Sequence, residues 1–549
     1  MAVRLGILLV YLLITLIIGL VFRKKSMTNR VEFFLAGRKL SKTLLFFTLA
    51  ATNFSAFTIF GLSGAGYRIG YAFYPVMGFG TGFMALSFYL IGSKILILSK
   101  KRNYITPSDY IADRYNSPFL KKLFSVIMLL FTLPYIAIQT VASGKSLHSL
   151  IGLPYLTGAM LISGFIILYV VLGGMRSIAW TDLIQGLMLV LFTLAAFLII
   201  SGKIGGFTAV HREISSRYPS LLSRPGLDGS MTIGVWISYL VLWFFADPMF
   251  PQLFQRFMAA RDEKTLNASI VFYPLITTFL FFLTVSIGVM GRLVFPDLPV
   301  SQSDTIFPLL LQKYTGVFLS TLLLTGSIAA LMSTMDSQLL TLTSIVTVDF
   351  MKSKKPGVFW EKLTIVVIGI LGFLLAVKPP QTILGFINKT TFNGLSVLAP
   401  TVIGGLYWKR ANRYAAIASI LSGQVLVVCF YYGWLQVTGM LPVIPILLVT
   451  IAVFIAVSLL TNPGGENMEI VFPIDRRFLK WGPVFFAFFL LGIDFWAWNK
   501  TPVLIAGLPL WVWYYITLGI LLSLAFRLFL SGFSSKKPGE TEEWVIIKK

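Results

Sequence analysis

Long hydrophobic runs separated by short polar stretches recur along the whole chain. Runs such as 5–22 and 443–460 have about 18 residues, which is enough for a helix to cross a hydrocarbon core about 30 Å thick. With charged residues, prolines and glycines taken as boundaries, the pattern predicts an all-α polytopic membrane protein with about 13–15 spans. The fullest set of expected spans is 4–22, 43–66, 72–98, 122–147, 154–173, 179–200, 232–255, 266–293, 318–348, 360–378, 382–407, 413–435, 443–460, 480–498 and 508–530.

The composition supports a membrane protein and excludes an ordinary soluble enzyme. Hydrophobic residues make up 57% and charged residues 12% of the 549 residues, against about 25% charged residues in soluble domains. The longest stretches expected outside the membrane, such as 201–231, have about thirty residues, which is too few for a catalytic domain. The two histidines, His148 and His211, are expected to be solvated loop residues. We therefore predict that the protein is not an enzyme.

The basic residues indicate an orientation in the membrane. The formal net charge is +24, but the Lys and Arg residues form short clusters between spans, so we expect the lipid bilayer, and not nucleic acid, to be the partner. With the N-terminus outside, about three quarters of the basic residues fall in cytoplasmic loops, as the positive-inside rule requires. We predict a multi-pass cell-membrane protein with an external N-terminus and a cytoplasmic tail at 531–549.

Three acidic residues, Asp182, Asp247 and Asp336, lie inside expected spans. An ionisable side chain at mid-membrane depth costs at least about 2.5–3.5 kcal/mol, so each needs a partner or a function. The run 326–340 around Asp336 is rich in hydroxyl groups, and the small and polar residues that share one face of that helix are Ala330, Ser333, Thr334 and Ser337. Taken alone, this face is either part of a site or a small-residue contact between helices.

Two expected spans contain residues that disfavour a continuous helix. Segment 49–67 mixes Gly, Ser and Thr with apolar residues. A helix that unwinds there would release backbone carbonyls, which are suitable ligands for sodium, although tight packing at its glycines also explains the composition. Segment 243–256 has two internal prolines and must bend. The bent span follows the other by five places, so two repeats of five helices are a natural interpretation.

Taken in order, these segments resemble the sodium/solute symporter family, which includes proline, pantothenate and sugar carriers. The resemblance covers roughly residues 32–408. The segments that carry it are Phe34-Leu-Ala-Gly-Arg38, 53–67, Gly173-Gly174, Trp180-Thr-Asp-Leu-Ile-Gln185, Gln255-Arg256-Phe-Met-Ala-Ala260, Met332-Ser-Thr-Met-Asp-Ser-Gln-Leu-Leu340 and Asp349. Each segment is a weak signal alone, but their order and spacing make a chance match improbable.

The resemblance implies a LeuT-like core of two inverted five-helix repeats with extra helices at both ends. The expected organisation is an N-terminal extra helix and cytoplasmic loop at 1–42, a ten-helix transport core at 43–410, additional C-terminal helices at 411–530 and the tail at 531–549. No obligate protein partner is inferred.

The family resemblance also implies a sodium site. In the family, the main sodium ion is held by carbonyls of the broken first core helix and by oxygens of the eighth. Carried over to this sequence, the implied ligands are the carbonyls of Ala51, Phe54 and Ala330 and the hydroxyls of Ser333 and Thr334. The polar face found independently contains the last three, so Na+ is the expected coupling ion.

Some members of the family bind a second sodium ion. The matching positions here are Asp182, Ser333 and Ser337, and Asp336 stands where some of those members carry a hydroxyl. A carboxylate at that position either strengthens such a site or pairs elsewhere, so the number of ions stays open. The structural alternative for Asp182 is a buried acid paired with a backbone group or with Arg176.

The solute is expected to bind between the two broken spans. Asn53 and Ser55 match positions that affect sodium and substrate binding in the family. The further candidates for substrate or gate residues are Phe57, Phe60, Trp243, Asp247 and Phe250. Core packing is the more common role for any single aromatic residue among them. The sequence Met249-Phe250-Pro251 lacks the Gly-Gln that precedes this proline in proline carriers, which weakens a proline assignment.

These features predict a secondary active transporter that couples sodium to the symport of a small organic solute, an amino acid or a small organic acid, by alternating access. The alternative is a proton-coupled solute symporter that uses Asp182 or Asp336, and the hydroxyl pair Ser333 and Thr334 argues against it. A channel is disfavoured because the sequence has no selectivity-filter repeat.

Overall fold

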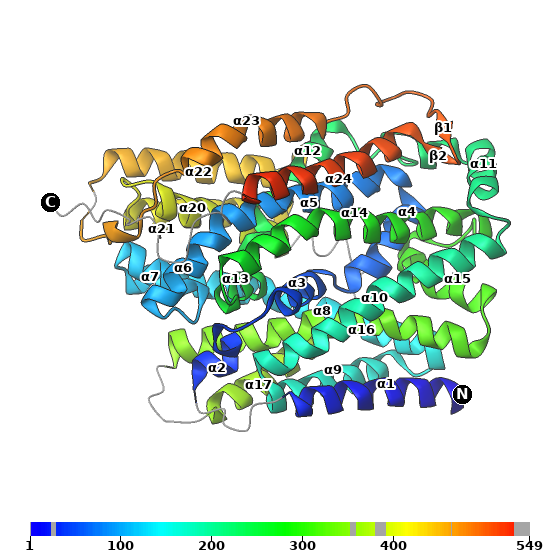
Figure 1. Cartoon of the computed structure of the whole chain (residues 1–549), viewed down its shortest axis with the longest axis horizontal. Helices are drawn as coiled ribbons and strands as arrows, with labels where there is room; N and C mark the ends of the chain where they lie inside the picture. Colours follow the sequence, from blue (N-terminus) through cyan, green and yellow to red (C-terminus); the bar gives the residue numbers. More distant parts are fainter. Residues whose placement is uncertain (1, 23–28, 352–357, 379–390, 463, 532–549) are drawn as a thin grey trace.

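The computed structural model describes residues 2–22, 29–351, 358–378, 391–462 and 464–531. The described chain is helical almost throughout (Figure 1). The α-helices are α1 (Ala2–Val21), α2 (Arg30–Leu35), α3 (Lys42–Asn53), α4 (Leu62–Arg68), α5 (Tyr74–Ser87), α6 (Ser93–Arg102), α7 (Pro107–Tyr115), α8 (Pro118–Ile151), α9 (Tyr155–Gly173), α10 (Met175–Lys203), α11 (Phe207–Arg217), α12 (Ile233–Ala246), α13 (Pro251–Ala259), α14 (Glu263–Val294), α15 (Ile306–Tyr314), α16 (Val317–Ser344), α17 (Phe359–Leu375), α19 (Thr391–Ser396), α20 (Ala399–Tyr407), α21 (Arg413–Tyr431), α22 (Val443–Leu460), α23 (Arg476–Leu491) and α24 (Leu510–Ser531).

Short 3-10 and π-helical turns extend or join several of these helices. They are η1 (Ala36–Arg38), η2 (Phe57–Gly61), η3 (Tyr71–Phe73), η4 (Phe88–Gly92), η5 (Pro219–Leu222), η6 (Asp247–Met249), η7 (Val300–Thr305), η8 (Ile345–Phe350) and η9 (Met468–Ile470). Strands β1 (Leu504–Ile505) and β2 (Leu508–Pro509) pair as an antiparallel hairpin just before α24, with Leu504 opposite Pro509.

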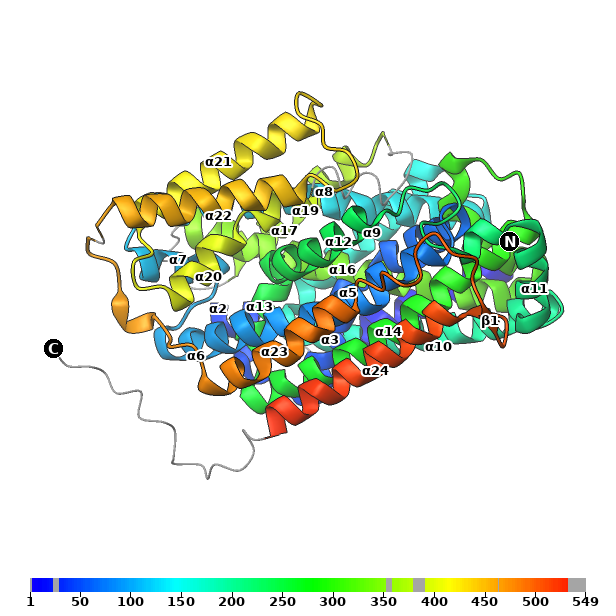
Figure 2. The same ribbon diagram turned by 90° about the horizontal axis from the view of Figure 1, so that it is seen from above.

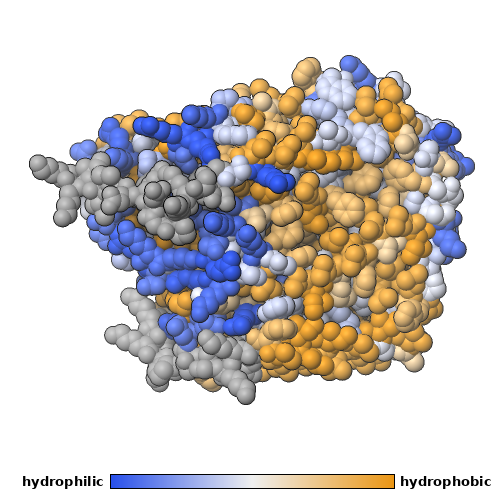
Figure 3. All heavy atoms as spheres, in the orientation of Figure 1, coloured by the Kyte–Doolittle hydropathy of each residue, from blue (hydrophilic) through white to orange (hydrophobic). Residues whose placement is uncertain are grey.

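The membrane-spanning helices match the expected pattern. Within the described residues, ten helices are long and apolar enough to cross a membrane, and twelve spans result if each of two bent helix pairs counts as one. The remaining expected spans fall on shorter helices: α17, α19 with α20, and α23. A hydrophobic band covers most of the face in Figure 3, and hydrophilic residues gather at the end that carries α2, α6 and α7.

One expected span ends earlier than the sequence suggested. Residues 480–498 were expected to be helical, but α23 ends at Leu491. The side chain of Asp494, shortly after this end, forms a buried ion pair with Arg224 at 2.9 Å. Because that contact holds the chain against the loop before α12, the hydrophobic run continues as irregular backbone and not as helix.

Two spans are broken, as the sequence predicted. The axes of the helices before and after the break differ by 59° between α3 and the η2–α4 segment, and by 58° between α12–η6 and α13. In the first case α3 ends at Asn53, and Phe54 leaves helical geometry with φ −87° and ψ 89°. In the second case Pro248 and Pro251 lack the amide hydrogens that a continuous helix needs.

The broken helices lie at the centre of the bundle. Helix α10 packs against α3 and α16, helix α14 packs against α4 and α5, and α8 packs against α9 and α16. Figure 2 shows α21 and α22 along one side of this core and α24 along the other. The hydroxyl-rich stretch of α16 is therefore surrounded by protein and not by lipid, and its residues 320 to 345 are buried except Leu322.

Helices α4 and α14 approach each other very closely. A Cβ atom added to Gly288 would overlap the carbonyl oxygen of Ser63, and one added to Gly66 would overlap the carbonyl oxygen of Val285. Neither backbone carbonyl can move aside without displacing its helix. The segment after the break in the first core helix is thus held against α14 by contacts that only glycine allows.

His211 is buried, which corrects the prediction that both histidines are solvated. His148 is exposed near the end of α8, but His211 on α11 is 0% exposed. Its Nδ1 lies 2.7 Å from the carbonyl oxygen of Phe207, which can only accept, so Nδ1 carries the proton. Its Nε2 lies 2.7 Å from the hydroxyl of Tyr71. Burial lowers the pKa of His211 to about 4.

Candidate functional site

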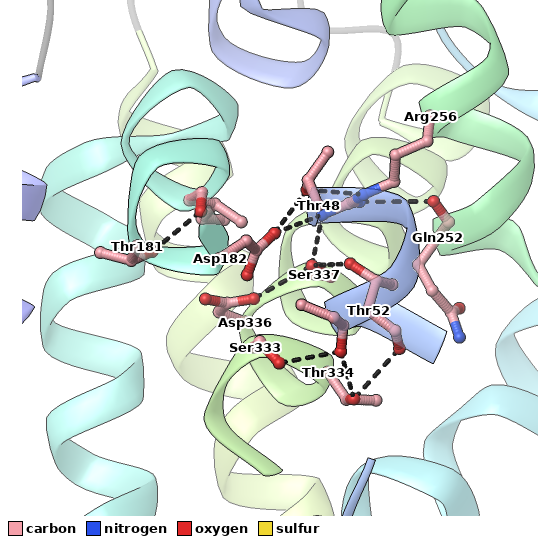
Figure 4. A network of polar contacts seen from close by, with 12 residues as sticks. Thr48, Thr52, Thr181, Asp182, Gln252, Arg256, Ser333, Thr334, Asp336 and Ser337 are labelled. Carbon is pink, nitrogen blue, oxygen red and sulfur yellow. Dashed lines mark hydrogen bonds and ion pairs between the residues drawn. The ribbon is translucent and has the colours of Figure 1, made fainter. Parts of the chain in front are cut away.

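The end of α3 meets the hydroxyl face of α16 in the middle of the bundle (Figure 4). The Ser333 hydroxyl lies 2.9 Å from the carbonyl oxygen of Ala51 and 3.0 Å from that of Ala330. The Thr334 hydroxyl donates to the carbonyl oxygen of Thr52 at 3.0 Å. The last carbonyls of a helix have no amide partner within it, so the break after Asn53 is what makes the Ala51 and Thr52 oxygens available.

The resulting cluster contains only oxygen atoms as ligands. Three carbonyl oxygens, from Ala51, Thr52 and Ala330, and two hydroxyl oxygens, from Ser333 and Thr334, come together from two helices. Hard cations prefer such oxygen ligands, and carbonyls of an unwound helix are a common part of sodium sites in transporters. The donor set therefore fits a sodium ion.

Four of the five implied sodium ligands take part in the hydrogen bonds of this cluster, and for the fifth, the carbonyl of Phe54, the role of ligand stays a prediction. Phe54 lies just past the break: its amide donates to the carbonyl of Ala50, and its ring packs against those of Tyr273 and Phe281. No hydrogen bond joins its carbonyl to the described residues of the cluster. The carbonyl of Thr52, which is not among the implied ligands, takes part in the cluster as well. The rule that a helix leaves its last carbonyls unpaired would have indicated Thr52 as well.

A second polar network lies beside this cluster, between α3, α10, α13 and α16 (Figure 4). Asp182 accepts a hydrogen bond from the hydroxyl of Thr48, and its Oδ2 lies 3.6 Å from Nη2 of Arg256. Arg256 also donates to the hydroxyl of Ser337, which in turn donates to Oδ1 of Asp336 at 3.0 Å. The structure thus brings together Asp182, Asp336 and Ser337, the residues proposed for a second ion.

Arg256 is the residue of this network that the sequence reasoning did not select as a site residue. It belongs to the family motif 255–260, but its partner could not be read from the sequence. Its side chain is 0% exposed, and it pairs with Asp182. The alternative partner considered for Asp182, Arg176, is half exposed and lies 3.9 Å from Glu32. The sequence could have indicated that Arg256 forms such a pair, because an arginine at the end of a hydrophobic span needs an acidic partner.

Among the described residues, the network holds two carboxyl groups for one guanidinium group. The second carboxyl, Asp336, accepts hydrogen bonds from Tyr169 and Ser337 and makes no ion pair with a described residue. The other oxygen of Asp182, Oδ1, is buried and has no hydrogen-bond partner in the part of the chain that the structure describes. With both acids ionised, the cluster therefore carries a net negative charge, and Oδ1 of Asp182 is free to accept a hydrogen bond or to bind a cation.

The expected solute residues meet where the two broken spans face each other. Asn53 donates through Nδ2 to Oδ2 of Asp247 at 3.1 Å, which joins the break in the first span to the break in the bent span. Ser55 accepts a hydrogen bond from the hydroxyl of Tyr135 at 3.1 Å. Phe250 lies against the Tyr135 ring with ring centroids 5.5 Å apart.

Two of the expected gate residues lie on η2. Phe57 follows the break directly, and its amide donates to the hydroxyl of Ser55 at 3.1 Å. Phe60 lies further along and contributes to a narrow cavity with Ala142 and Asp304, away from Asp247. The roles of the seven residues expected to bind solute or form a gate stay predictions.

The family model described as "Sodium:solute symporter family" matches residues 33–423. The sodium/pantothenate symporter of Escherichia coli (strain K12) is 28% identical over 460 residues, which cover 82% of this chain and 94% of that protein. The osmoregulated proline transporter OpuE of Bacillus subtilis (strain 168) is 27% identical over 492 residues, which cover 86% of this chain and 97% of that protein.

Solved structures support the fold. A sodium-coupled sialic acid symporter, solved in a substrate-bound outward-open state, matches with a TM-score of 0.70 and 19% identity and covers 85% of this chain and 99% of that one. MHP1, a nucleobase-cation-symport-1 family transporter, matches with a TM-score of 0.55 and 11% identity, covering 78% and 95% of the two chains. The fold is the LeuT-like fold that the sequence predicted. The chain therefore belongs to the sodium:solute symporter family, whose members are membrane transporters and not enzymes.

Proposed function

We propose that this protein carries out sodium-coupled symport of a small organic solute by alternating access, with the sodium ion bound between the end of α3 and α16. The observation that carries the proposal is the pair of hydroxyls of Ser333 and Thr334, which face the released carbonyls of Ala51 and Thr52. Residues of two different helices would share one ion, so its binding would favour the arrangement in which these helices lie together.

The hydroxyl groups of Ser333 and Thr334 can interact with the carbonyls of α3 in two ways, by hydrogen bonds or through a shared sodium ion. Without an ion, the hydrogens of Ser333 and Thr334 point at backbone oxygens. When sodium is bound, both hydroxyls present oxygen lone pairs to it and the carbonyls become its ligands. The contact between α3 and α16 is then stronger than with hydrogen bonds alone. This difference in binding between conformations is what can couple the ion gradient to the solute.

The energy of one ion is sufficient for accumulation. A sodium ion that enters across a membrane potential of about 100 mV, negative inside, releases about 2.3 kcal/mol, which supports a solute concentration ratio of about fiftyfold. We propose that the neighbouring cluster of Asp182, Arg256 and Asp336 has a supporting role, because a guanidinium group already lies beside Asp182 and Ser337. The second candidate function is a proton-coupled symporter, and the observation in its favour is the presence of two carboxyl groups in this cluster.

We propose an external N-terminus and a cytoplasmic C-terminus in the cell membrane. The start of α1 and the end of α24 point to opposite ends of the molecule (Figure 1). Helices α2, α6 and α7 lie at the end where hydrophilic residues gather (Figure 3). The basic residues Lys100, Lys101 and Arg102 close α6 at that end, which supports a cytoplasmic assignment for it under the positive-inside rule.

The test is uptake by proteoliposomes of a labelled panel of amino acids, short organic acids and sugars, with either an inward sodium gradient or an inward proton gradient. The test variant is Ser333→Ala/Thr334→Ala. The control is Ser320→Ala/Thr321→Ala, a Ser-Thr pair on the same helix whose hydroxyls donate to the Val317 carbonyl. We expect sodium-driven uptake that the test variant loses and the control keeps. Uptake driven only by protons, and indifferent to both pairs, would establish the second candidate instead.

A further inference from the structure

Asp247 differs from the other buried aspartates of the bundle because no cationic side chain of the described residues reaches it, either directly or through one hydroxyl group. It lies at the break between α12 and α13 and is 2% exposed. Asp182, Asp304, Asp349 and Asp494 each form an ion pair with an Arg or Lys side chain. Asp336 makes no ion pair with a described residue either, but the hydroxyl of Ser337 joins it to Arg256. Among the described residues, the hydrogen-bond partner of the Asp247 side chain is the neutral amide of Asn53, and no cationic side chain pairs with it.

A carboxylate in this position is costly without a positive partner. The cost at mid-membrane depth is at least about 2.5–3.5 kcal/mol for an ionised side chain, and one neutral amide does not offset a full charge. Asp247 also forms part of the contact between the two broken spans, where transporters of this architecture place their substrate. The missing partner is therefore expected to come from the transported molecule.

Aromatic rings form the wall beside Asp247. The ring of Phe392 on α19 lies 4.9 Å from that of Trp243, 5.5 Å from that of Phe250 and 6.2 Å from that of Tyr135, measured between centroids. Trp243 lies four positions before Asp247 and Phe250 three positions after it. The amide of Asp247 donates to the carbonyl of Trp243, and the amide of Phe250 donates to the carbonyl of Asp247. Ring faces attract organic cations, and aromatic groups around a carboxylate are a recognised way to bind a substituted ammonium.

Two further buried polar atoms at this break have no partner in the described part of the chain. Trp243 is 2% exposed, and its Nε1 donor has no hydrogen-bond acceptor among the described residues. Gln252, also 2% exposed, has an unpaired Oε1 acceptor. Buried donors and acceptors nearly always have hydrogen-bond partners in folded proteins. One donor and one acceptor without partners, at the same break as a carboxylate without a cationic partner, therefore indicate a polar ligand.

We propose that the transported solute carries a cationic nitrogen, which pairs with Asp247 and lies against the rings of Trp243, Phe250 and Phe392. A protonated amine and a quaternary ammonium share this chemistry. The inference rests on the proposed function and specifies the class of solute.

The experiment measures uptake of labelled solutes by proteoliposomes driven by an inward sodium gradient, a readout that does not depend on the net charge moved. Solutes are offered as matched pairs that differ in the charged nitrogen: choline against 3,3-dimethylbutan-1-ol, proline against cyclopentanecarboxylate, and alanine against propionate. We expect sodium-dependent uptake of at least one nitrogen-bearing member, with apparent affinity at least about thirtyfold higher than for its partner, as the loss of a buried charge pair implies.

Three variants link this preference to the carboxylate. Asp247→Asn should reduce the preference for the nitrogen-bearing member to a few-fold, and Asp247→Glu should retain it. Glu213→Gln is the matched control, because Glu213 is 46% exposed in its side chain and lies on α11, where it pairs with Arg217. Gel filtration and sodium-dependent thermal stabilisation show that each variant is folded.

The outcomes separate this inference from the function on which it rests. Sodium-driven uptake of uncharged or anionic solutes alone, or an Asp247→Asn protein with unchanged preference, would overturn the assignment of the cationic nitrogen and leave sodium coupling intact. The absence of sodium dependence for every solute would instead contradict the proposed function, and the inference with it.

Discussion

Replacing Arg256 by Gln removes the guanidinium group from the polar network beside the ion site. The side chain is fully buried, and its Nη2 lies 3.6 Å from Oδ2 of Asp182. At this distance, and with an effective dielectric constant of about 20, the attraction is worth about 5 kcal/mol. Removing one partner of a buried pair typically costs about 3–5 kcal/mol, since the other charge stays unpaired. We expect Arg256→Gln to lower the free energy of unfolding by about 3–5 kcal/mol.

The assay is equilibrium unfolding in mixed detergent micelles, arranged as a double-mutant cycle with Asp182→Asn. Because the Asp182→Asn substitution replaces the carboxylate by an uncharged amide, the double variant should recover most of the loss, with a coupling energy of at least about 2 kcal/mol. Arg224→Gln is a control for burial alone: Arg224 pairs with Asp494 at 2.9 Å, and both side chains are 0% exposed. We expect a comparable loss of stability from it but unchanged sodium affinity.

Two results would refute this reasoning. One is an Arg256→Gln protein that is destabilised by less than about 1 kcal/mol, which would mean that Asp182 is neutral in the folded state. The other is a double variant whose loss equals the sum of the single losses, which would mean that the two side chains do not interact.

Two other features give further predictions. The stability of the protein should fall by about 3 kcal/mol as the pH drops from 6.5 to 4, because the folded state holds the pKa of His211 at about 4 while the unfolded chain takes up its proton near pH 6.5. Unfolding measured against pH should show a smaller fall in His211→Gln, and equal profiles would contradict this cause. Gly288→Ala should destabilise the protein by roughly 1–3 kcal/mol, since its Cβ would overlap the carbonyl of Ser63. Gly164→Ala, whose Cβ would meet no atom within 4 Å, should change stability by less than about 0.5 kcal/mol in the same measurement, and an equal effect of the two would rule out the overlap.

The sequence predicted the elements that depend on local chemistry. Hydrophobic runs and their boundaries indicated the spans, and the prolines at 248 and 251 indicated the bent one, because a missing amide hydrogen acts at its own position in the chain. The hydroxyl face of α16 could also be read directly, since Ser333 and Thr334 share it by helical spacing alone.

Features that depend on contacts between distant segments were not predictable in this way. Arg256 and Asp182 are 74 positions apart in the chain (256 − 182), and they meet because α13 and α10 both pack against α3 and α16. His211 lies in a short polar segment that the hydropathy pattern assigns to solvent, but its contact with Tyr71 buries it. The contact of the Thr52 carbonyl with Thr334 depends on where the helix unwinds, which hydropathy does not define.

The most direct test of the central claim is binding of radioactive sodium to the purified protein, measured by scintillation proximity. We predict saturable binding to the native protein that Ser333→Ala/Thr334→Ala weakens at least about tenfold, because hydrogen bonds and ligand contacts to a charged group contribute about 1.5–3 kcal/mol each. The Ser320→Ala/Thr321→Ala control should bind sodium like the native protein. Equal sodium affinity in all three proteins would contradict the assignment of the ion to the contact between α3 and α16.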